Sequence, residues 1–391
     1  MRAKLLAALV AAVFAVGTVS FAGPAFAWEK GSTIVHTGVN VEERWDSNIF
    51  YDPTGEKDDF ITIITPKISG EQGFGPSDKH KIKADYKVDL GMFGKYHSQN
   101  YGNHNILGEV ALDFDEYTLT VSDNFLFTSD RAGTEFDSRN LRKENTGKAV
   151  LGMKFNKLAF DVGYSHYIVA FHSNSLGGFD RYENSVWTTG YVQVMPKTQA
   201  LLEYKYKNIQ YNHTSGRNAN DNSVLAGVKG EITAKLTGIA KAGYKYKGYI
   251  NAPSGQEDFS SAVVNTYLTY APLERLNILF GYEREGFEST YSNNNYYTGD
   301  HFITDVNYKL GNSDFTAKGT GEYFRNDYPE IGTGETVARL DNIWGVGGGV
   351  EYSPKEWLVC GVGYKYNKRD SNIASRTYDQ HIVMTNVSLM F

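Results

Sequence analysis

Charged side chains recur at every second position in several segments of this sequence, and this spacing places them on one face of a β-strand. In residues 82–92, Lys83, Asp85, Lys87 and Asp89 alternate with apolar residues and tyrosine. A strand with this pattern presents one face to an apolar medium and the other to water. Because both signs of charge occur together, we expect the charged face to wet and screen an aqueous passage.

The same alternation, followed along the chain, predicts a larger set of charged side chains that line the passage. The candidate pore-lining residues are Lys83, Asp85, Lys87, Asp89, Glu109, Glu203, Lys205, Lys207, Lys241, Lys245, Lys247, Glu283, Asp305, Lys309, Lys318, Glu322, Glu351 and Lys365. They form either a solvated wall or a screen for anionic solutes or polymer. We favour the solvated wall, because a water-filled passage requires wall charges in any case.

Catalytic chemistry finds little support in the sequence. Five histidines lie near long polar segments, where a hydrolytic Ser–His or Asp–His pair would have to form: His97, His104, His166, His172 and His213. None belongs to a serine-nucleophile elbow or an H-E-x-x-H helix, and no Rossmann or P-loop motif occurs. The single Cys360 provides no disulfide framework, haem attachment or thiolate metal cluster. We therefore predict that the chain is not an enzyme and needs no metal or cofactor.

The first long polar segment, residues 45–58, contains the carboxylates Asp46, Asp52, Glu56 and Asp58. Carboxylate oxygens are calcium ligands, but these residues do not follow EF-hand spacing. We expect them to be solvated loop acids. The sequence leaves open whether this segment folds into the passage as a constriction.

The N-terminus has the three parts of a secretory signal peptide. Arg2 and Lys4 precede an apolar run at 5–16, and a small-x-small site at 25–27 predicts a mature chain that starts at Trp28. A membrane anchor is the alternative, but this run is shorter than the about 20 residues that span a bilayer. We expect residues 1–27 to be removed and residues 28–391 to form one domain. Removal of Arg2 and Lys4 leaves 37 of the 39 basic residues, compared with 45 acidic residues. The mature chain therefore has a negative net charge, which does not favour a nucleic-acid partner.

A repeat of 38 to 41 residues runs through most of the chain. It is marked by tyrosines that stand just before long polar segments: Tyr164, Tyr204, Tyr244, Tyr282, Tyr323 and Tyr364. A unit of this length is either a propeller blade of four short strands or a barrel hairpin of two long ones. The alternation over 82–92 covers eleven residues, which matches the about 9–11 of a membrane-crossing strand. The tyrosines then mark an outer aromatic girdle.

The connections alternate between short turns and long loops, as in outer-membrane barrels with periplasmic turns and extracellular loops. The predicted long loops are 129–145, 168–182, 208–221, 286–299 and 324–339. The predicted strands are 34–44, 59–69, 80–92, 105–114, 116–128, 146–155, 158–167, 183–194, 198–207, 223–230, 235–246, 259–270, 275–284, 301–310, 315–323, 341–352, 357–366 and 378–391. We therefore predict an all-β, antiparallel, up-and-down transmembrane β-barrel of about 18 strands, within a range of 16–18. Its environment would be outer-membrane lipid and lipopolysaccharide.

The last strand places Val383, Val387, Leu389 and Phe391 on one face and ends on an aromatic residue. This pattern resembles the C-terminal signal that the barrel-assembly machinery reads, which implies that machinery as a partner and Phe391 as the assembly signal. Asn386 departs from the pattern, which favours glycine at that position.

A family resemblance emerges in the first strands. The run Val39-Asn40-Val41-Glu42-Glu43-Arg44-Trp45-Asp46-Ser47-Asn48-Ile49-Phe50 is followed by Asp58-Asp59-Phe60-Ile61-Thr62 and Thr65-Pro66. This arrangement resembles the putative β-barrel porin type 2 family; the specific part covers about residues 39–93. The resemblance implies a porin-like outer-membrane barrel, with a role in exopolysaccharide export and periplasmic polysaccharide-export proteins as partners. It transfers no catalytic residue. Three functions remain open: a diffusion pore, an export conduit, and a plugged barrel that acts as a surface receptor or scaffold.

Overall fold

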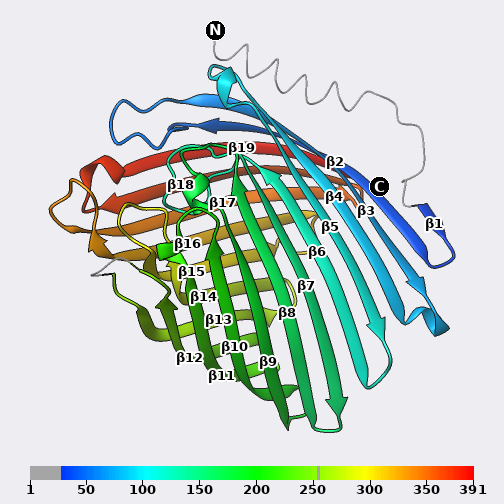
Figure 1. Cartoon of the computed structure of the whole chain (residues 1–391). Coiled ribbons are helices and arrows are strands. Elements are labelled where there is room, and N and C mark those ends of the chain that lie inside the picture. The colour runs from blue at the N-terminus through cyan, green and yellow to red at the C-terminus, as the bar shows by residue number, and fades with distance from the viewer. Residues whose placement is uncertain (1–27, 253–255) are drawn as a thin grey trace.

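The computed structural model describes residues 28–252 and 256–391, which form a closed antiparallel barrel of eighteen strands, β2 to β19 (Figure 1). The first nine are β2 (Thr33–Asp46), β3 (Asp59–Phe74), β4 (His80–Phe93), β5 (Tyr101–Asp113), β6 (Tyr117–Thr128), β7 (Arg142–Phe155), β8 (Leu158–Phe171), β9 (Arg181–Met195) and β10 (Thr198–Tyr211). The others are β11 (Ala219–Thr233), β12 (Leu236–Tyr249), β13 (Phe259–Leu273), β14 (Leu276–Glu288), β15 (Tyr296–Lys309), β16 (Phe315–Ile331), β17 (Ala338–Lys355), β18 (Leu358–Ser371) and β19 (Tyr378–Met390). The predicted fold class and its eighteen strands are confirmed.

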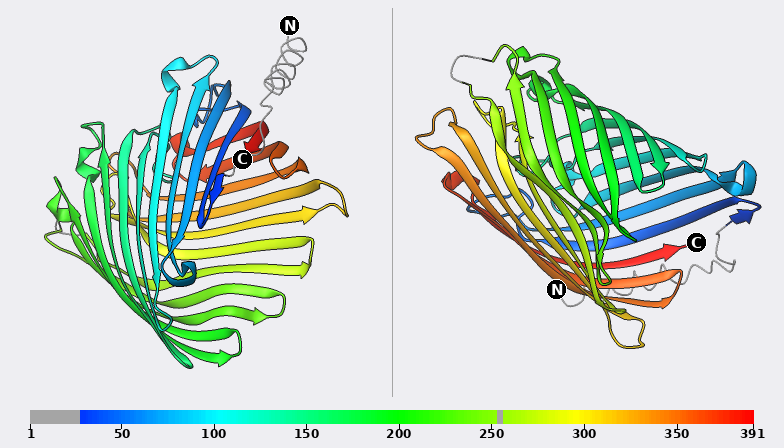
Figure 2. Two further views of the ribbon diagram at one scale, coloured as in Figure 1. Left: turned by 90° about the vertical axis from the view of Figure 1, so that its right-hand side faces the viewer. Right: turned by 90° about the horizontal axis from the view of Figure 1, so that it is seen from below.

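Each strand pairs with its neighbours in the sequence, and the ends of the chain close the ring. Strand β19 lies beside β2, as the red and blue ribbons show in Figure 2, with a register that runs from Ile382 opposite Asp46 to Met390 opposite Gly38. Beyond β19, the backbone amide and carbonyl of Phe391 exchange hydrogen bonds of 2.7 and 2.8 Å with Thr37. The last residue therefore completes the seam of the barrel. A short additional strand, β1 (Trp28–Lys30), pairs only with the start of β2.

The outer face of the barrel is apolar because successive side chains of a strand point to opposite sides. On β10, for example, Leu202 and Tyr204 are 60% and 45% exposed, while Glu203 between them turns inward to an ion pair. Such residues belong on the lipid side, where an apolar band is flanked by aromatic girdles. Carboxylates interrupt this pattern at two of these outward positions near the middle of a strand. Asp123 on β6 and Glu43 on β2 share the outward parity of their apolar neighbours.

The strands extend further at the loop end than the hydropathy pattern predicts. Residues 142–145, 168–171 and 208–211, which we predicted as loop, belong to β7, β8 and β10. Residues 142–145 are polar on both faces, whereas residues 168–171 are apolar on both faces and include the buried Val169. The apolar–polar alternation is therefore lost at the loop end although the backbone pairing continues. At the opposite end, the predicted short turns occur. Asn156, in the turn between β7 and β8, has a φ of 51°, which asparagine tolerates better than most residues.

Five short 3₁₀ segments interrupt the connections: η1 (Pro76–Asp78), η2 (His97–Gln99), η3 (Gly177–Phe179), η4 (Ser215–Arg217) and η5 (Ala374–Arg376). In residues 28–252 and 256–391, no helix has the length and apolar character needed to cross a membrane. The predicted signal peptide, residues 1–27, lies outside the described residues.

Candidate functional site

The loop between β6 and β7, residues 129–141, crosses the interior of the barrel. Its Glu135 is only 8% exposed, although it belongs to a connecting loop. The Glu135 carboxylate accepts hydrogen bonds from the Ser289 hydroxyl at 2.6 Å and from the Thr290 amide at 2.7 Å. These partners lie in the loop between β14 and β15. In a ring of eighteen strands, β6 and β14 stand on nearly opposite walls, so the loop must span the lumen.

Further contacts fix this inward loop on the far wall. The hydroxyl of Thr134 accepts a hydrogen bond of 2.7 Å from Asn326 on β16. The carboxylate of Asp137 pairs with Arg369 on β18 and, at 2.6 Å, with Arg376 of η5. The Arg369 side chain is only 1% exposed. The loop is therefore anchored by buried, charge-assisted hydrogen bonds, which are about twice as strong as neutral ones.

The loop between β14 and β15 that receives Glu135 is itself rigidly held. The guanidinium of Arg339 lies 4.6 Å from the ring centre of Tyr291, and both residues are buried. The Tyr291 hydroxyl donates a hydrogen bond to Glu335. Burial, together with this hydrogen bond, raises the pKa of Tyr291 to about 12, so the phenol remains a donor at neutral pH.

Sequence reasoning did not single out residues 129–141 as an inward loop. Its candidate for a constriction was the segment 45–58. In the structure, Ile49 of this segment packs against the inward-facing Ile61, Ile63 and Phe93, and its carbonyl accepts a hydrogen bond of 2.6 Å from Arg131 of the inward loop, so the segment folds over the inner wall at the mouth of the barrel. There, Asn48 is fully buried and hydrogen-bonds to the carbonyls of Asp52 and Asp379. One local signal was available in the inward loop. Gly133 has a φ of +77°, a conformation that favours glycine and sharply turns the chain.

A cavity of about 620 Å³ lies between the inward loop and the wall formed by β7 to β15. Its lining combines residues 132–136 of the loop with six cationic and eight anionic side chains. The cationic residues are Arg142, Arg181, Lys205, Lys207, Lys241 and Lys245. The anionic ones are Glu135, Glu144, Glu183, Glu203, Asp221, Glu283, Glu285 and Glu288. The cavity is thus highly charged but close to electrically balanced.

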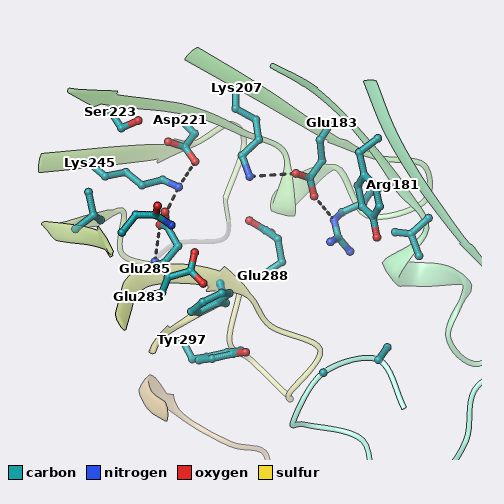
Figure 3. A pocket seen from close by; sticks show the side chains of 18 of the residues that line it. Arg181, Glu183, Lys207, Asp221, Ser223, Lys245, Glu283, Glu285, Glu288 and Tyr297 are labelled. Atoms are coloured by element: carbon teal, nitrogen blue, oxygen red, sulfur yellow. Dashed lines mark hydrogen bonds and ion pairs between the residues drawn. The ribbon is translucent and has the colours of Figure 1, made fainter. Parts of the chain in front are cut away.

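Most cationic groups of the cavity are paired with carboxylates on the same strand, on the adjacent strand or on the next strand but one (Figure 3). Lys245 lies 2.6 Å from Asp221 and 2.9 Å from Glu285, and Lys207 lies 3.0 Å from Glu183. The Lys241–Glu203 pair also measures 3.0 Å. Ion pairing cancels much of the positive potential that the lysine count alone implies. The arrangement favours a hydrated wall with ordered donors and acceptors over an anion screen.

Several predicted residues pair elsewhere along the wall. Lys247 pairs with Glu288, Lys318 with Glu351 at 2.6 Å, and Lys365 with Glu322 at 2.9 Å. Lys83 lies 3.5 Å from Glu71, and Lys87 lies 3.9 Å from Asp89. Other predicted residues have no ion-pair partner within residues 28–252 and 256–391; they are Asp85, Glu109, Lys205, Glu283, Asp305 and Lys309. Whether this set lines a conducting pore stays a prediction.

Sequence reasoning predicted only Glu203 and Glu283 among the eight acidic residues of the cavity and missed the other six. Among the missed acids, Glu183, Asp221 and Glu285 are partners of the cavity lysines, Glu288 pairs with Lys247, and Arg181 lies 2.9 Å from Glu183. Arg181, Asp221 and Glu288 fall in segments that we predicted as loop. Arg181, Glu183 and Asp221 continue the inward parity of their strands, so extending the alternation past the tyrosine girdle would have found them.

The other chemical candidates are dispersed. The ring of His104 lies 2.9 Å from the Tyr86 hydroxyl, and that of His166 lies 2.8 Å from the Asn184 side chain. The acids of the segment 45–58 also have separate partners: Asp52 lies 3.5 Å from Lys57, and Asp58 lies 2.8 Å from Lys95. Within the described ranges, no three His, Cys, Asp or Glu residues gather in a way that could hold a metal ion.

The sequence model of the putative beta-barrel porin 2 family matches residues 26–391. The chain belongs to this family. The predicted resemblance is therefore confirmed, over a longer part of the chain than the first strands that carried it. A comparison with curated proteins finds no match. Membership of a porin family and the closed barrel place the protein among porin-like proteins of the Gram-negative outer membrane.

Solved outer-membrane proteins share the architecture of this putative beta-barrel porin 2 member. The outer membrane protein OpdK of Pseudomonas aeruginosa has a TM-score of 0.50 at 11% identity, over 91% of this chain and 99% of that chain. OccAB3 of Acinetobacter baumannii has a TM-score of 0.50 at 10% identity, over 92% and 99%. OpdQ of Pseudomonas aeruginosa has a TM-score of 0.50 at 12% identity, over 91% and 98%. At these identities the similarity concerns the fold alone.

Proposed function

We propose that this barrel is a channel that passes hydrophilic solutes or polymer across the outer membrane, and that its physiological cargo is an exopolysaccharide on its way out of the cell. The observation that carries the channel is the charged, ion-paired cavity beside an inward loop that is anchored on both walls. A loop of this kind narrows a passage and leaves room beside it. The role in export rests on the family resemblance in the first strands, with periplasmic polysaccharide-export proteins as partners.

A plugged barrel that serves as a surface receptor or scaffold is the second candidate. The anchored loop supports it as well, because the contacts of Glu135 and Asp137 would also hold a permanent plug in place. The two candidates differ in whether ions pass. A hydrolase is disfavoured, because neither the fold nor the dispersed histidines supply a catalytic pair.

Conductance and secretion together test the proposal. We expect the purified protein, refolded into planar bilayers, to give discrete single-channel currents. We also expect a deletion strain to retain exopolysaccharide inside the cell envelope and to recover secretion when the gene is restored. Normal secretion in the deletion strain would remove the role in export. The absence of currents from correctly folded protein would favour the plugged receptor.

A further inference from the structure

Three aromatic side chains form a regular series on the inner wall of β8 and β9. In the register of these strands, Tyr167 lies opposite Glu183, Gly163 opposite Trp187, and Ala159 opposite Tyr191. The backbone positions of the three residues are therefore separated by equal steps of four residues. Each step is about 13 Å along the strand, so the series covers about 27 Å. We call Tyr167, Trp187 and Tyr191 the aromatic series.

The rings of the aromatic series are held in place along the wall. The Tyr167 hydroxyl donates a hydrogen bond of 2.9 Å to Glu144, and the Tyr191 hydroxyl donates one of 2.8 Å to Asp161. The Trp187 ring lies directly on Gly163, where a Cβ atom would be only 2.0 Å from the ring. Glycine at this position thus permits the indole to lie against the backbone. Rings that are fixed in this way lose little freedom when a ligand binds.

A cationic side chain accompanies each ring. Arg181 lies 5.8 Å from the ring centre of Tyr167, Lys148 lies 5.5 Å from that of Trp187, and Lys229 lies 5.4 Å from that of Tyr191. Within residues 28–252 and 256–391, Lys148 and Lys229 make no ion pair. Their ammonium groups remain available to donate hydrogen bonds, since a cation–π contact at a solvated site contributes only about 0.5–1 kcal/mol.

This combination fits one class of ligand. Flat apolar rings stack on the C–H faces of sugar rings, and lysine and carboxylate groups bind the hydroxyls at the sugar edges. The equal steps over about 27 Å match an extended chain better than a single small solute. Tyr167, at one end of the series, lines the charged cavity described above. The lining of that cavity has eight acidic and six basic side chains, and this excess of negative charge disfavours binding of a polyanion. We propose that the aromatic series is a binding track for a linear, uncharged glycan chain; this inference rests on the proposed channel and specifies its cargo.

Calorimetry on the full-length protein in detergent tests binding without requiring conduction. The probes are cellohexaose, maltohexaose and chitohexaose, with hexagalacturonate as the charged counterpart and polyethylene glycol of similar mass as a chain that cannot stack. We expect at least one neutral hexasaccharide to bind, hexagalacturonate to bind more weakly, and polyethylene glycol not to bind. If all three neutral probes fail to bind, or if polyethylene glycol binds equally well, the track does not exist. Tighter binding of hexagalacturonate would overturn the assignment to an uncharged chain.

Variants locate the binding on the wall. Trp187→Leu and Tyr191→Leu should each weaken binding about 2- to 10-fold, which corresponds to one aromatic contact. The matched control is Trp344→Leu, because Trp344 is 46% exposed and its parity on β17 places it on the outer face. Equal affinities in all three variants would sink the proposal. Binding of a glycan without any conductance would contradict the proposed channel but support the binding track. Conductance without binding of any glycan would support the channel and contradict the binding track.

Discussion

The Glu135 carboxylate lies 2.6 Å from the Ser289 hydroxyl, although the two residues are 154 positions apart in the chain. This contact joins the inward loop after β6 to the loop after β14, on nearly opposite walls of the barrel. Two more hydrogen bonds, from the amide and the hydroxyl of Thr290, complete the shell of the same carboxylate. The Glu135 side chain thus supplies one of the anchors that hold the loop across the lumen, beside those of Thr134 and Asp137.

Glu135→Ala should release the inward loop. The change removes three hydrogen bonds to a charged group, each worth about 1.5–3 kcal/mol, and leaves the contacts of Thr134 and Asp137 as the remaining anchors on the far wall. We expect a larger and noisier single-channel conductance with normal barrel folding. Asp314→Ala, which removes an exposed carboxylate from a short turn, should leave the conductance unchanged. If both variants conduct like the wild type, the contact does not limit the passage.

Two lysines of the inner wall should respond differently to substitution. Lys241 is 15% exposed and pairs with Glu203, so Lys241→Glu places two carboxylates side by side and should cost about 1–3 kcal/mol, below the roughly 3–5 kcal/mol of a fully buried pair. Lys205 has no ion-pair partner in the described chain, so Lys205→Gln should fold normally and shift ion selectivity toward cations. Urea titrations in lipid vesicles and reversal potentials measure both effects; equal stability of the two variants would contradict the pairing.

The outward face should reject charge. Ala240→Arg places a cation on the lipid side of β12, which costs about 2–4 kcal/mol near the bilayer midplane. Asp123 lies on that face between Gly108 and Gly147 of the adjacent strands, and its side chain accepts a hydrogen bond of 2.9 Å from Asn145. Asp123→Val should therefore raise the free energy of unfolding, by less than the arginine penalty. Refolding equilibria in lipid vesicles provide the measurement, and a destabilised Asp123→Val would show that the carboxylate is matched by another group in the membrane.

Cysteine labelling should distinguish the two rims. In a Cys360→Ser background, we expect Ser175→Cys and His213→Cys to react on intact cells with a maleimide that is too large to pass the lumen. Lys157→Cys and Asn312→Cys should react only after the outer membrane is opened. A probe near residue 136, an obvious choice from loop length alone, is unsuitable because that loop is folded inward. Reversed labelling would invert the topology.

Phe391→Asp should reduce the amount of folded barrel. Phe391 exchanges two backbone hydrogen bonds with Thr37 at the seam, and its side chain has the outward parity of β19. A charge there faces lipid and removes the aromatic end that the assembly machinery is expected to read. Heat-modifiable protein in outer-membrane fractions measures the effect, with Phe391→Tyr as the conservative control. Normal levels of the Asp variant would refute a role of the terminal residue.

The sequence by itself determined the class, number and order of the strands, because period two is a local property. Each strand must present an apolar face to lipid and a polar face to water, and residues 82–92 reveal this without any knowledge of their neighbours. The positions of the short turns can be predicted in the same way, because each turn lies where the alternation of one strand ends and that of the next begins. The alternation lost its signal only beyond the aromatic girdle. There residues 142–145 are polar on both faces and residues 168–171 are apolar on both faces, so the pattern does not show where the strands end.

Only the tertiary structure decided what fills the barrel. Glu135 and Ser289 are ordinary polar loop residues in the sequence, and no periodicity relates them. The partners of the lysines were hidden in the same way, because Glu203 and Lys241 stand on β10 and β12, with another strand between them. Closure of the barrel brings such distant groups together. The position of a residue in the alternation predicts that its side chain points into the lumen, but it does not predict which side chain it contacts there. The inward path of the loop depends on contacts with the opposite wall, which exist only after the barrel has closed.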